Sequence, residues 1–328
     1  MTYKDSGVDI KKGERAVSDV KSMIKSTFTP NVLGSIGGFG GLFEVPQGYK
    51  KPVLVSSTDG VGTKLSVAVK AGKHDTVGED LVNHCINDIA VLGAKPLYFL
   101  DYFGTANLDE QVFNNVISGF VRGCKNSEVA LVGGETAEMP GIYHDKDYDL
   151  CGTIVGIIEK DQIVTGEKIQ KGDKLIGIAS NGMHTNGYSL ARKVLFQSFE
   201  VNQHIDDLGC TLAEELLRVH KCYLGIIQSS LNKYNINGIS HITGGGIIGN
   251  TKRILPEGLS LSIDWESWDS QPVFELIQKT GSVPTEDMRN TFNLGIGLIL
   301  IVPENQSLQL QNEIKMQNEK AWIIGEIV

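Results

Sequence analysis

Pro52-Val53-Leu54-Val55-Ser56-Ser57-Thr58-Asp59-Gly60-Val61-Gly62-Thr63-Lys64, residues 52–64, joins an apolar, β-prone run to a glycine-rich turn. Residues 52–57 predict a strand, and the turn follows it without a break. Its Asp59 carboxylate can hold Mg²⁺, Gly60 and Gly62 open backbone N–H groups, and Thr63 and Lys64 can meet phosphate oxygens. The glycine spacing is not that of a P-loop, and a hairpin turn with an exposed lysine is the alternative interpretation.

The next segment predicts an amphipathic helix over residues 76–92 with two distinct faces. One is an apolar stripe of Val82, Cys85, Ile86 and Ile89. The other carries Asp80, Asn83 and Asn87, with Asp88 beside them and no Lys or Arg nearby. Oxygen-bearing side chains suit Mg²⁺, whereas the simpler interpretation is a solvated helix face.

Strands and helices alternate on both sides of this segment, which favours the α/β (α+β) class with layered domains. In the first half we expect helices at 12–26 and 109–125 and strands at 42–45, 96–103, 129–132 and 150–159. In the second half we expect helices at 188–199, 212–231 and 306–317 and strands at 174–179, 239–242, 295–302 and 321–328. A polar, turn-like stretch around 165–172 divides the chain, and we predict domains at 1–166 and 167–328.

Three further motifs lie where a strand gives way to a loop, the usual place for ligand sites in α/β proteins. They are Gly133-Gly134-Glu135-Thr136, Ser180 to Gly187 with its His184-Thr185-Asn186, and Thr243-Gly244-Gly245-Gly246. The glycines offer backbone N–H groups to an anion. His184 can bind phosphate, transfer a proton or only hydrogen-bond its own loop. The other histidines have no spacing typical of metal ligands.

Composition limits the classes of function. The chain has 328 residues, a net charge of −9 and 38 glycines, against about 23 expected at average usage. The acidic balance disfavours nucleic-acid binding, and no apolar run is long enough for a membrane span. Five scattered cysteines, without CxxC spacing, indicate a reducing compartment. With a polar N-terminus we expect no signal peptide and a cytoplasmic protein.

Taken together, the motifs resemble those of one enzyme family over nearly the whole chain. The matching segments, in order, are 37–41 (Gly-Gly-Phe-Gly-Gly), 58–64, Asn87-Asp88, 133–141, 184–190 and 241–246, with further matches at 99–102, 147–149 and 289–293. They resemble the phosphoribosylformylglycinamidine cyclo-ligases, also called AIR synthetases, of de novo purine biosynthesis.

The resemblance implies two α/β domains, the first pairing its sheet with that of a second copy in a homodimer. It implies ATP and Mg²⁺, with a need for K⁺ left open, and formylglycinamidine ribonucleotide as the substrate that is closed to aminoimidazole ribonucleotide. For the site it leads us to expect Asp59, Asp88 and Glu135 at Mg²⁺ and phosphate, together with Asn83 and Asp80. Lys64 is expected to stabilise the transferring phosphoryl group, with Asp59 and His184 as further catalytic residues. Nucleotide or substrate phosphate is expected at Gly60, Gly62, Thr63, Gly133, Gly134, Thr136, Thr185, Asn186, Gly244, Gly245 and Gly246.

One segment departs from the family pattern. Val219-His220-Lys221 stands where Pro-Thr-Arg is expected, and lysine lacks the planar fork with which arginine grips phosphate. Other ATP users of the same architecture, selenophosphate synthetase and thiamine-monophosphate kinase, are alternatives. The former wants a reactive cysteine near the N-terminus, whereas the first cysteine here is Cys85. An inactive nucleotide-binding module is a third, which predicts eroded acidic and glycine motifs.

Overall fold

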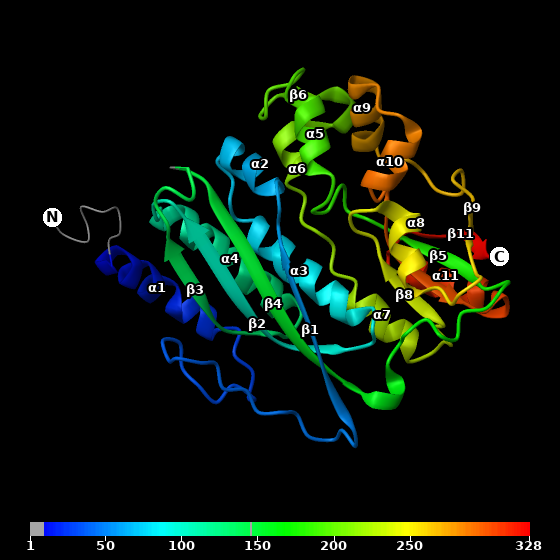
Figure 1. Ribbon diagram of the computed structural model, residues 1–328, viewed down its shortest axis with the longest axis horizontal. Coiled ribbons are helices and arrows are strands. Elements are labelled where there is room, and N and C mark those ends of the chain that lie inside the picture. Colours follow the sequence, from blue (N-terminus) through cyan, green and yellow to red (C-terminus); the bar gives the residue numbers. More distant parts are fainter. Residues whose placement is uncertain (1–9, 145) are drawn as a thin grey trace. The chain divides into compact units, whose positions relative to one another are not determined.

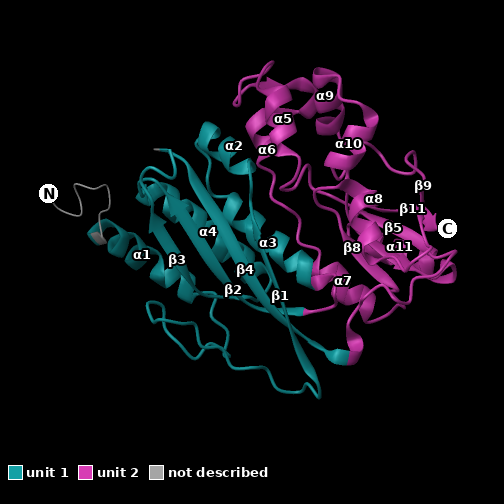
Figure 2. Cartoon of the chain, viewed as in Figure 1, with its two compact units in different colours: residues 1–89, 95–160 teal, residues 90–94, 161–328 magenta. Residues whose placement is uncertain are grey.

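The computed structural model describes residues 10–144 and 146–328, which divide into two units. Unit 1 comprises residues 1–89 and 95–160, and unit 2 comprises 90–94 and 161–328 (Figure 2). The predicted boundary at 166/167 remains a prediction. Within the described residues no helix is both long and apolar enough to cross a membrane.

Unit 1 is a four-stranded sheet in the order β1-β4-β2-β3 with helices on one face (Figure 1). Its elements are α1 (Ile10–Lys25), β1 (Pro52–Gly60), α2 (Lys64–Ala71), α3 (Val77–Ala90), β2 (Lys95–Thr105), α4 (Glu110–Asn126), β3 (Ala130–Glu138) and β4 (Tyr148–Glu159). β4 pairs antiparallel with β1 and β2, whereas β2 and β3 are parallel and are joined through α4. This mixed α/β layer confirms the predicted fold class.

The buried stripe of α3 is packed closely onto the sheet. Cys85 and Ile89 are both buried, and the Cys85 thiol lies 3.6 Å from the Gly152 carbonyl oxygen on β4. A Cβ on Gly152 would lie 2.1 Å from the Phe99 ring, so glycine is required at this close approach. The apolar face predicted from the 3–4 spacing therefore holds α3 against the end of β1.

Unit 2 is built on a five-stranded antiparallel sheet in the order β8-β10-β5-β11-β9. Its larger strands and helices are β5 (Lys174–Ala179), α5 (Tyr188–Leu195), α6 (Leu212–Leu216), α7 (Leu224–Leu231), β8 (Gly238–His241), α8 (Gly246–Thr251), β9 (Leu261–Ile263), α9 (Pro272–Gly281), α10 (Thr285–Thr291), β10 (Ile296–Val302), α11 (Glu304–Met316) and β11 (Ala321–Ile327). A hairpin of β6 (His204–Ile205) and β7 (Cys210–Thr211) lies outside the sheet. β10 is buried along its whole length, as expected for a central, wholly apolar strand.

Two predicted elements are wrong. Residues 42–45 form no strand, because only Phe43 makes an isolated bridge, to Val32. The predicted helix 212–231 is two helices, α6 and α7, separated by an irregular segment. The Val219 carbonyl accepts a hydrogen bond from the Asn181 side chain, and the Tyr223 hydroxyl donates to Ala179. These contacts attach the irregular segment and the start of α7 to the rest of unit 2.

Candidate active site

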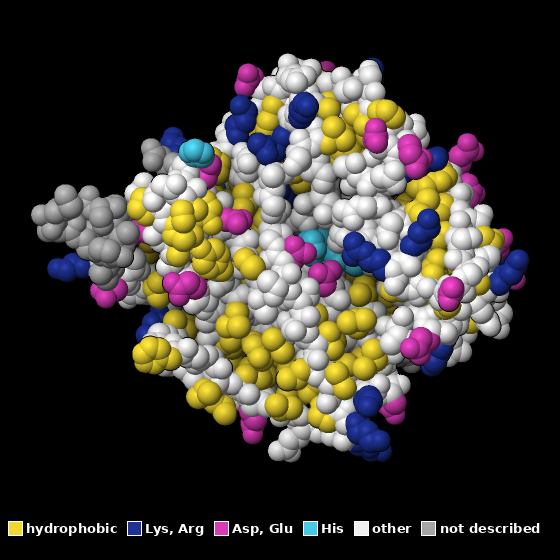
Figure 3. Space-filling model, viewed as in Figure 1, with side chains coloured by type: hydrophobic (Ala, Val, Ile, Leu, Met, Phe, Trp, Pro, Cys, Tyr) yellow, Lys and Arg dark blue, Asp and Glu magenta, His cyan; other side chains and the backbone are white. Residues whose placement is uncertain are grey.

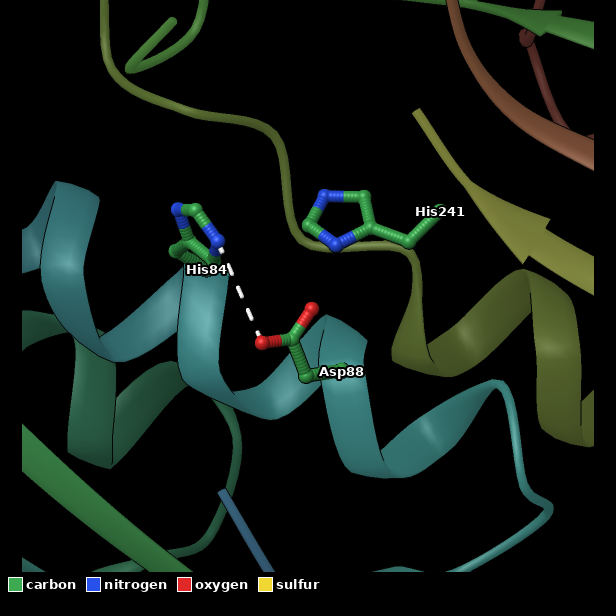
Figure 4. Close-up of side chains that lie close together, drawn as sticks. All are labelled: His84, Asp88 and His241. Carbon is green, nitrogen blue, oxygen red and sulfur yellow. Dashed lines mark ion pairs between the residues drawn. The ribbon is translucent and has the colours of Figure 1, made fainter. Parts of the chain in front are cut away.

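A cluster of charged side chains lies at the end of β1. Asp59 Oδ2 is 2.9 Å from His84 Nε2. The same nitrogen is 3.9 Å from Asp88 Oδ2, the ion pair that is dashed in Figure 4. His84 and Asp88 are four residues apart on α3, so they share one face of the helix. The Ser57 hydroxyl donates to Asp88 Oδ2 at 3.0 Å. The structure thus brings Asp59 and Asp88 to one place, with His84 between them and Ser57 bonded to Asp88.

His84 is the residue of this cluster that the sequence analysis missed. Burial lowers its pKa, but the hydrogen bond to Asp59 and the charges of Asp88, Asp59 and Asp80 outweigh burial and raise it overall. An imidazolium at this position offsets one of the two carboxylate charges. The available signal was its position four residues after Asp80 and four before Asp88 on a predicted helix.

Lys64 occupies an interior position. Its Nζ lies 2.8 Å from Asp80 Oδ2 and 2.9 Å from Oδ1, and both side chains are fully buried. Burial lowers the pKa of Lys64, and the neighbouring Asp80 carboxylate opposes that effect. The expected direct contact between Lys64 and a phosphoryl group does not fit this arrangement, because the ammonium is enclosed and already neutralised. Here Lys64 ties the start of α2 to the first turn of α3.

The polar face of α3 is not a solvated surface. Asp80, Asn83 and Asn87 are all buried, with at most 5% of each exposed. Asp88 and Asp59 reach solvent, with 25% and 42% of their side chains exposed. A cation bound to phosphate can therefore meet Asp59 and Asp88 from outside, whereas Asn83 is buried on α3.

Glu135 lies elsewhere in unit 1. Across the sheet, Glu135 on β3 lies opposite Tyr102 on β2, and Tyr102 lies opposite Cys151 on β4. Cys151 in turn lies opposite Gly60 at the end of β1. Glu135 is therefore level with the end of β1, but on the strand at the opposite edge of the sheet. Three strand spacings amount to about 14 Å. At this separation Glu135 cannot bind the same ion as Asp59 and Asp88.

Gly133, Gly134, Glu135 and Thr136 line a separate cavity of about 490 Å³. Its walls come from α1, the glycine-rich loop 35–41, α4, β2 and β3. Asp101 also lines it, and burial raises the pKa of this carboxyl to about 7. A Cβ on Gly134 would lie 2.2 Å from Asp101 Oδ1, so a side chain there would displace Asp101. The sequence analysis did not single out Asp101.

In unit 2 the two predicted loops lie against each other. A Cβ on Gly244 would be 3.3 Å from Asn186 Oδ1. Asn250 holds the glycine loop by donating to the carbonyls of Thr243, Gly244 and Gly246. Gly245 and Gly246 have φ of +101° and +65°, a region that favours glycine. His184-Thr185-Asn186 and Gly244-Gly245-Gly246 are thus brought together, as one polar site of unit 2.

Asn186 carries a donor that suits an anion. Its buried Nδ2 atom has no hydrogen-bond partner within the described residues. Buried amide donors are rarely left unpaired, so a ligand oxygen fits here. By contrast Lys221, in the segment that departs from the family pattern, binds the Glu319 carboxylate and lies 5.6 Å from the centre of the Tyr223 ring.

The donor set of unit 1 fits magnesium. Mg²⁺ is usually held by one or two carboxylates together with substrate phosphates and water. Asp59 and Asp88 supply two half-exposed carboxylates on either side of His84, whose proton can leave when a cation takes over the neutralisation. Gly60, Gly62 and Thr63 follow Asp59 directly and begin α2, with Gly62 at a φ of +68°.

Comparison with known proteins defines the class first. Residues 44–158 match the N-terminal domain model of AIR synthase related proteins, and residues 170–328 match the C-terminal domain model. The fold resembles thiamine-monophosphate kinase from Stenotrophomonas maltophilia, with a TM-score of 0.70, 17% identity, and 95% and 93% of the two chains covered. It also resembles a hydrogenase maturation protein, HypE, in complex with ATP, with a TM-score of 0.64, 16% identity, and 98% and 88% covered.

Full-length relatives then narrow the class. The chain is 48% identical over 330 residues to the phosphoribosylformylglycinamidine cyclo-ligase of Citrifermentans bemidjiense, covering 100% of this chain and 95% of that protein. This protein therefore belongs to the phosphoribosylformylglycinamidine cyclo-ligase family. The 17% identity to the kinase reflects a shared fold, so the kinase alternative loses its support.

Proposed function

We propose that this chain closes the ring of formylglycinamidine ribonucleotide to give 5-aminoimidazole ribonucleotide, with conversion of ATP to ADP and phosphate. The observation that carries the proposal is the 48% identity to a named cyclo-ligase along the entire chain. The acidic cluster at Asp59, the cavity beside Gly133-Gly134 and the polar loops of unit 2 supply sites for a triphosphate and a phosphorylated substrate. None of the acidic and glycine motifs is eroded, which argues against an inactive module.

The chemistry follows from the poor leaving-group character of an amide oxygen. The formyl oxygen attacks the γ-phosphorus of ATP, and ADP leaves. The amidine nitrogen then attacks the activated carbon, the carbon–oxygen bond breaks, and phosphate departs with the former formyl oxygen while a proton is lost from nitrogen. Such a reaction depends mainly on positioning and on neutralising phosphate charge.

Residues of unit 1 supply the neutralisation in this proposal. Asp59 and Asp88, with Asn83, are the residues that would hold Mg²⁺, which when bound screens the negative charge of the phosphates. Lys64 acts as a positioning residue through Asp80, because its own ammonium is enclosed. K⁺ has no residue assigned to it.

Glycine backbones and loop side chains hold the ligands. Gly60, Gly62 and Thr63 are proposed to face the phosphates beside Asp59, and Gly133, Gly134, Glu135 and Thr136 to line the nucleotide cavity. In unit 2, Thr185 and Asn186 with Gly244, Gly245 and Gly246 are proposed to hold a phosphate group. His184 is proposed to fix its loop, because its Nε2 accepts a hydrogen bond from the Asn181 backbone N–H at 3.0 Å.

A homodimer through the sheet of unit 1 is the further part of the proposal. The outward positions of β1 alternate with covered ones, and Leu54 there is 60% exposed. Figure 3 shows hydrophobic side chains gathered over the region of β1 and β4. Monomeric proteins rarely expose a large apolar patch, so this surface suits a contact with a second copy. Leu54→Glu should shift the molar mass measured by light scattering from dimer to monomer. A monomeric wild type would rule the dimer out.

The free cysteines support a proposed location in the cytoplasm. All five cysteines are free thiols, which suits the reducing cytoplasm.

The assay for the reaction measures ADP and aminoimidazole ribonucleotide in parallel, with Mg-ATP and with or without formylglycinamidine ribonucleotide. Equal amounts of both products, and neither without the substrate, are expected. ADP release that is independent of substrate, or that depends on another acceptor, would contradict the proposed substrate.

A further inference from the structure

Three buried histidines meet in unit 2, and one of them belongs to the segment that departs from the family pattern. His220 lies between α6 and α7 and is fully buried. Its ring stacks on His184, with ring centres 4.0 Å apart and an angle of 21° between the planes. On its other side, His220 Nε2 lies 3.0 Å from His241 Nε2, and its Nδ1 lies 3.2 Å from the Thr185 hydroxyl.

The proton positions in this chain depend on one another. A neutral imidazole has one N–H donor and one acceptor nitrogen. Between His220 Nε2 and His241 Nε2 only one proton can lie, so the state of one nitrogen fixes the opposite state of the other. The Thr185 hydroxyl can donate to His220 Nδ1 or accept from it. The chain Thr185–His220–His241 therefore has two self-consistent arrangements of its protons. The bond between the two Nε2 atoms makes the tautomer of one ring determine the tautomer of the other.

His220 also connects the two loops that are proposed to hold phosphate. Thr185 and His184 belong to the loop after β5, and His241 ends β8 and leads directly into Thr243 and the three glycines (His241 is labelled in Figure 4). Threonine, which the family pattern has at this position, has one oxygen next to Cβ and is too short to reach both partners. Only a longer side chain with two separated polar atoms bridges them.

We propose that His220 is a positioning residue that sets the orientation and Nε2 protonation state of His241 and so fixes the glycine loop that His241 enters. The effect expected on turnover rests on the proposed function, whereas the hydrogen bond itself does not. His220 contacts no substrate in this proposal; it acts through His241.

Two substitutions separate the two bonds of His220. In His220→Gln the terminal amide lies near the former Nε2 and keeps the bond to His241. In His220→Asn it lies near the former Nδ1 and keeps only the bond to Thr185. We expect His220→Asn to raise KM for the phosphorylated substrate about tenfold with kcat changed less, and His220→Gln to stay within about threefold. His204→Asn, the same substitution at an exposed histidine of unit 2, is the matched control and should change neither constant.

NMR of the wild-type protein tests the bond without turnover. A scalar coupling between ¹⁵N of His220 Nε2 and ¹⁵N of His241 Nε2 is expected across the N–H···N bond, and the His241 ¹⁵N shifts should move in His220→Asn but not in His220→Gln. Absence of the coupling, or equal KM values for the Asn and Gln variants, would overturn the proposal. A wild type that shows the coupling but no cyclo-ligase activity would instead contradict the proposed function, while the His220–His241 bond would still be supported.

Discussion

The buried ion pair between Lys64 and Asp80 gives the sharpest stability prediction. Both side chains are fully buried, with Nζ 2.8 and 2.9 Å from the two carboxylate oxygens. Lys64→Met leaves a buried carboxylate without its counter-ion, and Asp80→Val leaves a buried ammonium. Each single substitution should lower the free energy of unfolding of unit 1 by about 3–5 kcal/mol. The double substitution leaves neither charge and should recover to within about 2 kcal/mol of wild type.

Urea unfolding followed by far-UV circular dichroism measures these values. All three tryptophans, Trp265, Trp268 and Trp322, lie in unit 2, so tryptophan fluorescence of the same samples follows the unfolding of unit 2. Single substitutions that lower the free energy of unfolding by less than about 1 kcal/mol would refute the reasoning. So would a double variant whose loss equals the sum of the two single losses. Turnover of the folded double variant should stay within about tenfold of wild type. A much larger loss would restore Lys64 as a direct phosphoryl contact.

Three other predictions concern the metal cluster, the cavity and the glycine loop. Asp59→Asn should raise the Mg²⁺ concentration for half-maximal turnover roughly 10–100-fold; a half-maximal Mg²⁺ concentration unchanged from wild type would remove Asp59 from that role. Burial raises the pKa of Asp101 to about 7 in the folded state. Between pH 4 and 7 the folded protein therefore keeps a proton on this carboxyl that the unfolded chain has lost, so its stability falls as the pH rises through this range. From pH 4.5 to 8, Asp101→Asn should therefore gain up to about 4 kcal/mol relative to wild type in urea unfolding, and a constant difference would contradict the shift. Gly246→Ala places Cβ 1.9 Å from the Arg289 carbonyl oxygen at a φ of +65°, and should lower the melting temperature and raise KM; Gly249→Ala, with nothing within 4 Å, is the control that should do neither. Equal behaviour of the two alanine variants would mean that the glycine loop is not constrained.

Much of the fold could be predicted from the sequence because its elements are strongly patterned. The strand before Asp59 and the apolar stripe of α3 follow periods of two and of three to four, and both were found within a few residues of their observed bounds. The break after α6 could not be predicted, because the Asn181 and Tyr223 contacts that replace helix come from segments distant in sequence. Tertiary contacts of this kind leave no trace in local spacing.

The residues of the candidate site lie in motifs that can be found in the sequence, whereas their grouping depends on tertiary structure. The structure brings Asp59, at the end of a strand, close to Asp88 on a helix face, with His84 between them. The resemblance groups Glu135 with them, but strand order, which local sequence does not encode, puts it on the opposite edge of the sheet. Lys64 looked exposed beside two glycines, and only its pairing with Asp80 revealed a buried position.

The central claim is that ATP activates the formyl oxygen so that it leaves as phosphate. The direct measurement uses formylglycinamidine ribonucleotide labelled with ¹⁸O in the formyl group and determines the isotope in the phosphate released by the purified chain. The account predicts one ¹⁸O atom in each phosphate, formed in step with aminoimidazole ribonucleotide and ADP. Phosphate without ¹⁸O, with the label found in water, would contradict it.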